Sequence, residues 1–150
     1  MEGRNLFYIK QSITINAPLE KISAWTEPKC WPQWRVNYVG PSEIEGDVGV
    51  GTIIEGTLYI MGVPYQAREK IIEYTKTEEN VFLRTSAGEH ETGSAITLAV
   101  KANGTEVTIE SVKKLDDKEH SRRLLVEKIY ANNMRCSLEN LKTICENVDA

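Results

Sequence analysis

The feature that most limits how this chain can fold is a change of hydrophobic periodicity near residue 116. Before this point, apolar and polar residues alternate in short stretches, a pattern that predicts half-buried β-strands. We expect such strands at about 35–45, 51–60, 65–75, 80–86, 92–102 and 105–114.

Beyond residue 116, apolar residues recur every three or four positions, which is typical of one face of an α-helix. They are Val126, Ile129, Tyr130, Met134, Leu138, Leu141, Ile144, Cys145 and Val148. Neither glycine nor proline interrupts the segment to Asn147, and Asp116 or Asp117 can cap its start. A helix of about 30 residues is about 45 Å long, enough to cross a whole sheet.

The start of the chain predicts one more strand and two short helices. A strand from Leu6 to Ile15 alternates clearly, and an Asn-Ala-Pro sequence ends it. Pro18 suits the first position of an amphipathic helix over about 19–25, where its missing N–H costs nothing. Pro28 and Pro32 allow at most one further helical turn before the strands resume.

The connections between the expected strands are short, so neighbouring strands should form antiparallel hairpins. Asn103-Gly104 is the strongest hairpin pattern, because both residues accept a positive φ at little steric cost. A sheet of seven antiparallel strands is too wide to stay flat and must curl. Its concave apolar face needs a cover, and the C-terminal helix is the long amphipathic element that can supply it.

Length and composition fit a single α+β domain over residues 1–150. The net charge of -4 argues against a nucleic-acid partner, which would require a dense basic surface. Cys30, Cys136 and Cys145 have no metal-site spacing, and the last two are too far apart on one helix for a disulfide. With no signal-peptide pattern and no apolar run long enough to span a bilayer, we expect a soluble cytoplasmic protein without cofactor or metal.

Four segments, taken in order, resemble one known superfamily. They are the strand-Ala-Pro-helix segment Ser12–Ile22, Trp31-Pro32-Gln33-Trp34, the glycine loop Val48–Thr52, and the acidic strand Glu69–Tyr74. With the terminal helix, they resemble the START-like, polyketide cyclase/dehydrase superfamily (SRPBCC, helix-grip) over nearly the whole chain. The resemblance implies a seven-stranded curved sheet wrapped around the long helix, with a cavity for hydrophobic or amphipathic molecules between them.

Candidate ligand-binding residues come from the aromatic side chains and from the middle of the long helix. The aromatic candidates are Trp34, Tyr38, Tyr59, Tyr65 and Phe82, which can make a pocket apolar yet orient a ligand. On the helix, Asn133 could hydrogen-bond a ligand and Met134 could adapt to its shape.

Two questions about strand faces stay open. In the strand at 51–60, the set of Thr52, Ile54, Gly56, Leu58 and Ile60 is the more apolar, but a pocket can also accept Tyr59 and Met61. Arg68 or Arg84 could enter the cavity and meet a ligand carboxylate, pair with Glu55, or point into water. Of these residues and of those in the strand at 51–60, we count Glu55, Met61 and Arg84 among the candidate ligand-binding residues.

Two other segments carry weaker hypotheses. The Gly46–Gly51 loop lacks the spacing of a phosphate-binding loop, and its glycines suit a tight hairpin that could gate the cavity mouth. His90 lies between two glutamates in an expected loop, and a metal site would need more ligands nearby. We interpret it as a solvated residue.

Three functions fit this sequence. Binding, and with it transport, of a hydrophobic or amphipathic small molecule is favoured because groups in a catalytic arrangement are scarce. A cyclase or dehydratase enzyme would require two titratable side chains that face each other in the pocket. An interaction module of the chaperone-activator type would show a filled interior and an exposed apolar patch.

Overall fold

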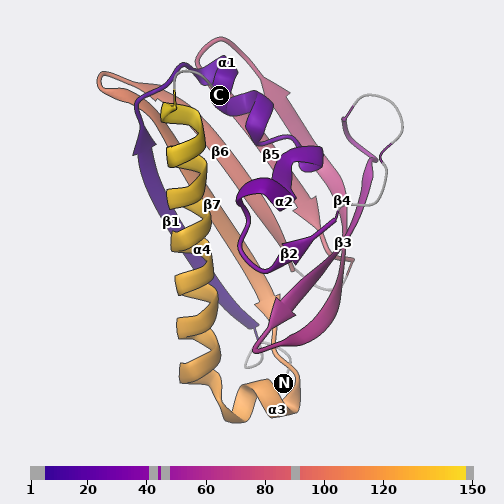
Figure 1. The fold of residues 1–150 in the computed structure, drawn as a ribbon. Coiled ribbons are helices and arrows are strands. Elements are labelled where there is room, and N and C mark those ends of the chain that lie inside the picture. Colours follow the sequence, from indigo (N-terminus) through magenta and orange to yellow (C-terminus); the bar gives the residue numbers. More distant parts are fainter. Residues whose placement is uncertain (1–5, 41–43, 45–47, 89–91, 148–150) are drawn as a thin grey trace.

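The computed structural model describes residues 6–40, 44, 48–88 and 92–147. Within these ranges the strands form one antiparallel sheet in the order β1-β7-β6-β5-β4-β3-β2 (Figure 1). The strands are β1 (Leu6–Ile15), β2 (Tyr38–Val39), β3 (Ile53–Ile60), β4 (Val63–Lys76), β5 (Asn80–Ser86), β6 (Gly93–Lys101) and β7 (Gly104–Lys114). The expected α+β architecture, with a seven-stranded curved sheet, is confirmed.

The helices lie on one side of this sheet (Figure 1). Between β1 and β2 come α1 (Leu19–Trp25), the 3₁₀ turn η2 (Pro28–Cys30) and α2 (Trp31–Trp34). After β7 come α3 (Asp117–Ser121) and α4 (Arg123–Glu146). Pro18 is the N-cap of α1, in extended conformation, rather than its first helical residue.

Two sequence expectations need correction. Among the described residues of the strand expected at 35–45, only the two of β2 are in a strand, because Asn37 and Gly40 adopt a positive φ on either side of it; residues 41–43 and 45 lie outside the described residues. The single terminal helix is broken at Arg122, whose φ of -114° and ψ of 29° are not helical. A capping box between Asp116 and Glu119 begins α3, and the break at Arg122 ends it, so α3 is a separate short helix that lies at an angle to α4 (Figure 1).

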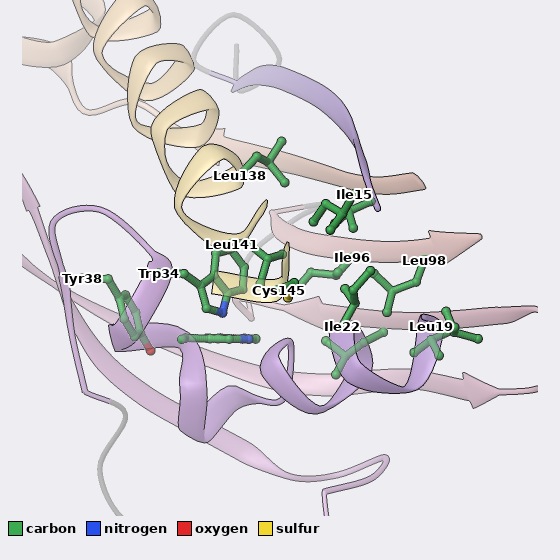
Figure 2. Packing of buried hydrophobic residues seen from close by; sticks show 14 of the residues in the cluster. Ile15, Leu19, Ile22, Trp34, Tyr38, Ile96, Leu98, Leu138, Leu141 and Cys145 are labelled. Carbon is green, nitrogen blue, oxygen red and sulfur yellow. The ribbon is translucent and has the colours of Figure 1, made fainter. Parts of the chain in front are cut away.

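The C-terminal half of α4 packs tightly against the sheet and α1 (Figure 2). Leu141 is fully buried, and Leu138 and Cys145 are each 2% exposed. Their neighbours in the same cluster include Ile15, Ile22, Trp34, Ile96 and Leu98. Close packing here leaves the space under this half of the helix filled.

Polar contacts fix α4 along the edge strand β1. The Gln11 amide donates to the carbonyl oxygen of Ala131 (2.9 Å), and the Lys142 ammonium donates to the carbonyl oxygen of Thr14 (2.9 Å). The Arg123 guanidinium donates to the carbonyl oxygen of Leu6 (3.0 Å). These contacts cover both ends of β1, so the helix is held in place even where apolar packing beneath it is incomplete.

Candidate ligand-binding site

An inner chamber of about 70 Å³ lies under the middle of α4, from Tyr130 to Ser137. Its apolar walls are Trp31, Trp34, Val36, Leu58, Ile96, Ile109 and Met134. The indole N–H groups of both tryptophans donate to backbone carbonyl oxygens, of Thr26 (2.9 Å) and Trp25 (2.8 Å). These two side chains therefore offer a ligand only apolar surface.

A wider vestibule of about 370 Å³ adjoins this chamber. Both spaces are lined by Arg35, Leu58, Ser94, Lys113 and Tyr130, so they meet at these side chains. The remaining vestibule walls are more polar than those of the chamber and include Tyr65, Glu69 and Glu119. The combined space is lined by apolar side chains at its inner end and by ionisable side chains at its outer end.

The segment after α2 is anchored to α4 by hydrogen bonds, which position one chamber wall. The hydroxyl of Ser137 accepts from the N–H of Val36 (2.9 Å) and donates to the carbonyl oxygen of Asn133 (2.7 Å). The amide of Asn140 donates to the carbonyl oxygen of Trp34 (3.2 Å). The polar residues of α4 thus hold the chain just before β2 at a fixed distance from the helix.

Arg35 is held by two aromatic rings. Its guanidinium carbon lies 4.8 Å from the ring centroid of Trp31 and 4.4 Å from that of Tyr38. The ring of Tyr38 in turn fits against Gly56, where an added Cβ would lie 2.3 Å from the tyrosine hydroxyl. Stacking on ring faces orients a guanidinium while leaving its N–H edge available.

Lys113 projects from the inner face of β7, where its neighbours two residues away are the buried Ser111 and Leu115. Its ammonium lies 5.0 Å from the ring centroid of Tyr130. Burial lowers the pKa of Lys113, and the charge of Arg35 lowers it further, while Glu69 and Glu119 act in the opposite direction. Among the described residues, no carboxylate lies within ion-pair distance of this ammonium.

Two buried carboxyl groups share the vestibule with these cations. Glu69, on β4, accepts a 2.6 Å hydrogen bond from the hydroxyl of Thr85. Glu119, on α3, accepts from the backbone N–H of Asp116 (3.1 Å), and burial raises the pKa of Glu119. Burial also raises the pKa of Tyr130, with a smaller contribution from Glu119.

Two donor groups in this region are buried without a hydrogen-bond partner among the described residues: the hydroxyl of Tyr38 and the amide nitrogen of Asn133. Burial raises the pKa of Tyr38 to about 12, so this hydroxyl keeps its proton at neutral pH. Asn133 lines the inner chamber, and its amide oxygen accepts from Asn37 (3.4 Å). Buried polar groups normally find partners, so these donors are notable.

Of the residues predicted from sequence to bind a ligand, the structure brings five to this region. Trp34, Asn133 and Met134 line the inner chamber, and Tyr65 lines the vestibule. Tyr38 is buried beside Arg35.

The other five predicted residues lie away from the chamber and vestibule. Tyr59 and Met61 are 38% and 49% exposed, since the buried face of β3 carries Ile54 and Ile60 instead. The acidic Glu55 forms an exposed ion pair with Arg68 (3.7 Å). The remaining two, Phe82 and Arg84, line an open trough of about 510 Å³ on the opposite face of the sheet, and Arg84 pairs with Glu73 (3.5 Å).

Sequence reasoning missed the polar residues of the site: Arg35, Glu69, Lys113, Glu119 and Tyr130. A usable pattern existed for Lys113, because it continues the inward-facing set of Val107, Ile109 and Ser111. The pattern Asp-x-x-Glu from Asp116 to Glu119 is that of a capping box, which would have fixed the position of Glu119.

The other hypotheses of the sequence analysis concern residues outside the chamber and the vestibule. Gly46 and Asp47 of the Gly46–Gly51 loop lie outside the described residues, as does His90. Within the described ranges, no group of three or more His, Cys, Asp or Glu side chains is placed to hold a metal ion. The three cysteines are free thiols. In the same part of the chain, no helix is both long and apolar enough to cross a membrane.

Replacing Lys113 with methionine is expected to raise the free energy of unfolding, and to do so more at pH 6 than at pH 10.5. Because the pKa of Lys113 is lowered in the folded state, the unfolded chain binds more protons between that lowered value and 10.5. Burying the charged lysine therefore costs stability below this window, and the cost disappears as pH rises through it. Urea unfolding at both pH values measures the effect, with the exposed Lys128→Met as control. A gain that does not depend on pH would contradict it.

The sequence matches no protein-family model, and no curated protein matches it. Solved structures do resemble the fold. KanY is 17% identical, with 94% of this chain and 98% of that chain covered and a TM-score of 0.73. The protein TTHA0849 from Thermus thermophilus is 17% identical, with 91% of this chain and 95% of that chain covered and a TM-score of 0.72.

The di-domain ARO/CYC protein BexL, from the BE-7585A biosynthetic pathway, is 12% identical, with a TM-score of 0.65. The match covers 95% of this chain but 51% of BexL, the length of one of its two domains. At these identities the likeness concerns the three-dimensional fold. The chain therefore shares the three-dimensional fold of these proteins, which is the helix-grip arrangement expected from its sequence.

Proposed function

We propose that this protein binds a small amphipathic molecule whose apolar part enters the inner chamber while its polar end stays in the vestibule. The observation that carries the proposal is the graded space under α4, apolar at Met134 and Trp34 and ionisable at Lys113 and Glu119. Ligand sites are typically concave, mostly apolar spaces of about 300–1,000 Å³ with a few placed polar groups. The vestibule volume of about 370 Å³ falls in this range.

The volume of the inner chamber limits the shape of the ligand. An apolar cavity of about 150 Å³ can hold benzene, whereas this chamber measures about 70 Å³. A narrow alkyl end fits the smaller space better than an aromatic ring does. Met134 can widen the chamber, since an unbranched thioether changes rotamer at low cost.

Native mass spectrometry of freshly purified protein tests this proposal. We expect part of the protein to carry an extra mass that is lost under denaturing conditions, or the protein to take up added decanol in a 1:1 complex. Protein that carries no such mass and binds neither decanol nor decanoate would rule out the proposed function.

An acid-base enzyme is the second candidate, because two titratable groups face the same vestibule with pKa shifts toward their neutral forms. Burial raises the pKa of Glu119 and lowers that of Lys113. A general acid or base works best when its pKa lies near the working pH. Several structures of the same fold are ARO/CYC proteins of biosynthetic pathways, including BexL and StfQ.

Proton exchange of a simple ketone would distinguish this candidate from plain binding. If the enzyme hypothesis is correct, the protein should accelerate deuterium uptake at the carbons next to the carbonyl group of 2-octanone in D₂O, followed by NMR. Glu119→Gln should abolish the acceleration, whereas Glu127→Gln, which lies outside both spaces, should not. If the unmodified protein does not accelerate the exchange, the enzyme hypothesis is wrong and ligand binding remains the proposed function.

A further inference from the structure

Among the described residues, hydrogen-bond donors without partners lie in and next to the inner chamber and the vestibule. The guanidinium of Arg35 and the ammonium of Lys113 line both spaces, and the amide nitrogen of Asn133 lines the chamber. The hydroxyl of Tyr38, whose ring stacks on Arg35, is buried against Gly56. Within the same ranges of the chain, neither Arg35 nor Lys113 forms a side-chain hydrogen bond or an ion pair; each is held by aromatic rings instead. Four donors in one region require acceptors from elsewhere.

The carboxyl, amide and serine side chains in the same region already take part in hydrogen bonds within the protein, the two carboxyl groups through one of their two oxygens each. Glu69 accepts from Thr85, and Glu119 closes the capping box of α3. The amide oxygen of Asn133 accepts from Asn37. The hydroxyls of Ser94 and Ser111, which line the chamber, bond to each other at 3.0 Å. The site therefore presents more free donors than free acceptors.

We propose that the ligand carries a carboxylate, which binds between Arg35 and Lys113 with its apolar tail directed into the inner chamber. This inference rests on the proposed function and names the chemical class of the ligand. The planar guanidinium presents parallel N–H groups that match the two oxygens of a carboxylate. Stacking against Trp31 and Tyr38 fixes the plane of Arg35 in advance, so little side-chain freedom is lost when the anion binds.

The charges around Lys113 also favour an anion. The like charge of Arg35 lies close enough to act on Lys113, and a bound carboxylate between them would relieve this repulsion. Glu69 and Glu119 face the same ammonium and balance part of the positive charge in the empty site. Their presence weakens the attraction for an anion, so removing one of these carboxylates should strengthen binding.

Decanoate and decanol form a matched pair of probes that share an apolar chain and differ in the head group. Calorimetric titration at pH 7 should show that decanoate binds about tenfold more tightly than decanol, as expected for charge-assisted hydrogen bonds. Lys113→Met should weaken decanoate binding about tenfold or more and leave decanol within about twofold. Lys128→Met, on the exposed surface of α4, should change neither affinity.

Two further variants keep the test decisive. Arg35→Met should weaken decanoate binding selectively, as Lys113→Met does, and so covers the case in which one variant fails to fold. Glu69→Gln retains an acceptor for Thr85 but removes the negative charge, so it should strengthen decanoate binding and not decanol binding. Equal affinity for both probes, unchanged in these variants, would overturn the carboxylate inference and leave the proposed function intact. Failure to bind either probe would overturn both.

Discussion

Replacing Leu141 with alanine is expected to lower the free energy of unfolding by about 2–5 kcal/mol, the range for a large-to-small change in a closed core. The exposed fraction of Leu141 is 0%, and its side chain packs with the sheet and α1. The lost side chain would leave a void that the surrounding close-packed residues cannot fill. Urea unfolding monitored by tryptophan fluorescence measures the change.

A comparison with Met134 tests whether α4 is packed less tightly at its middle, over the chamber, than at Leu141. Met134→Ala should cost about 1 kcal/mol, because this side chain already borders the chamber and gives up fewer packing contacts. Leu124, which is 80% exposed, should tolerate alanine within about 0.5 kcal/mol. Equal losses at Leu141 and Met134 would mean that both positions are packed equally tightly, in conflict with a chamber under the middle of the helix.

Replacing Met134 with tryptophan is expected to weaken decanol binding by about 100-fold or more, because an indole fills the chamber in which the alkyl chain would lie. The chamber of about 70 Å³ has no room for both groups. Thermal unfolding should show that the variant remains folded, since the added ring occupies existing space. Calorimetric titration with decanol gives the affinity.

Leu125→Trp is the matched control, because Leu125 is 50% exposed on the same helix and lines neither space. It adds the same indole at the surface and should bind decanol as the unmodified protein does. If Met134→Trp retained normal affinity, the ligand would have to bind elsewhere. The open trough at Phe82 and Arg84 would then be the next site to test.

The fold could be predicted from the sequence because the alternation of apolar and polar residues and the preferences of turn residues are local properties. Ile54 and Ile60 belong to the more apolar set of β3, and both are buried. A hairpin does join β6 to β7 as expected, but its two turn residues are Ala102 and Asn103, and Gly104, at a φ of 139°, is the first residue of β7 and pairs with Lys101. The start of the terminal helical segment at Asp116 was expected, but the break at Arg122 was missed because neither glycine nor proline marks it in the sequence.

Only the apolar part of the site could be predicted from the sequence, because sequence reasoning places charged side chains in solvent. Apolar candidates such as Trp34 and Met134 were found because burial is the default for such side chains. Lys113 and Glu69 were missed because the same default places charges in water, although strand alternation puts both on the inner face. Inward charges depend on long-range neighbours such as Arg35, which no local pattern reveals.

Methionine-methyl NMR tests the central claim most directly, which is that the middle of α4 covers a space that accepts a ligand. The chain has three methionines: Met134 at the chamber, Met61 on the exposed β3–β4 turn, and Met1 outside the described residues. In protein with ¹³C-labelled methionine methyl groups, added decanoate should shift the Met134 signal and give nuclear Overhauser contacts between that methyl and the alkyl chain. The Met61 signal should stay in place. An unchanged Met134 signal at saturating decanoate would contradict the account.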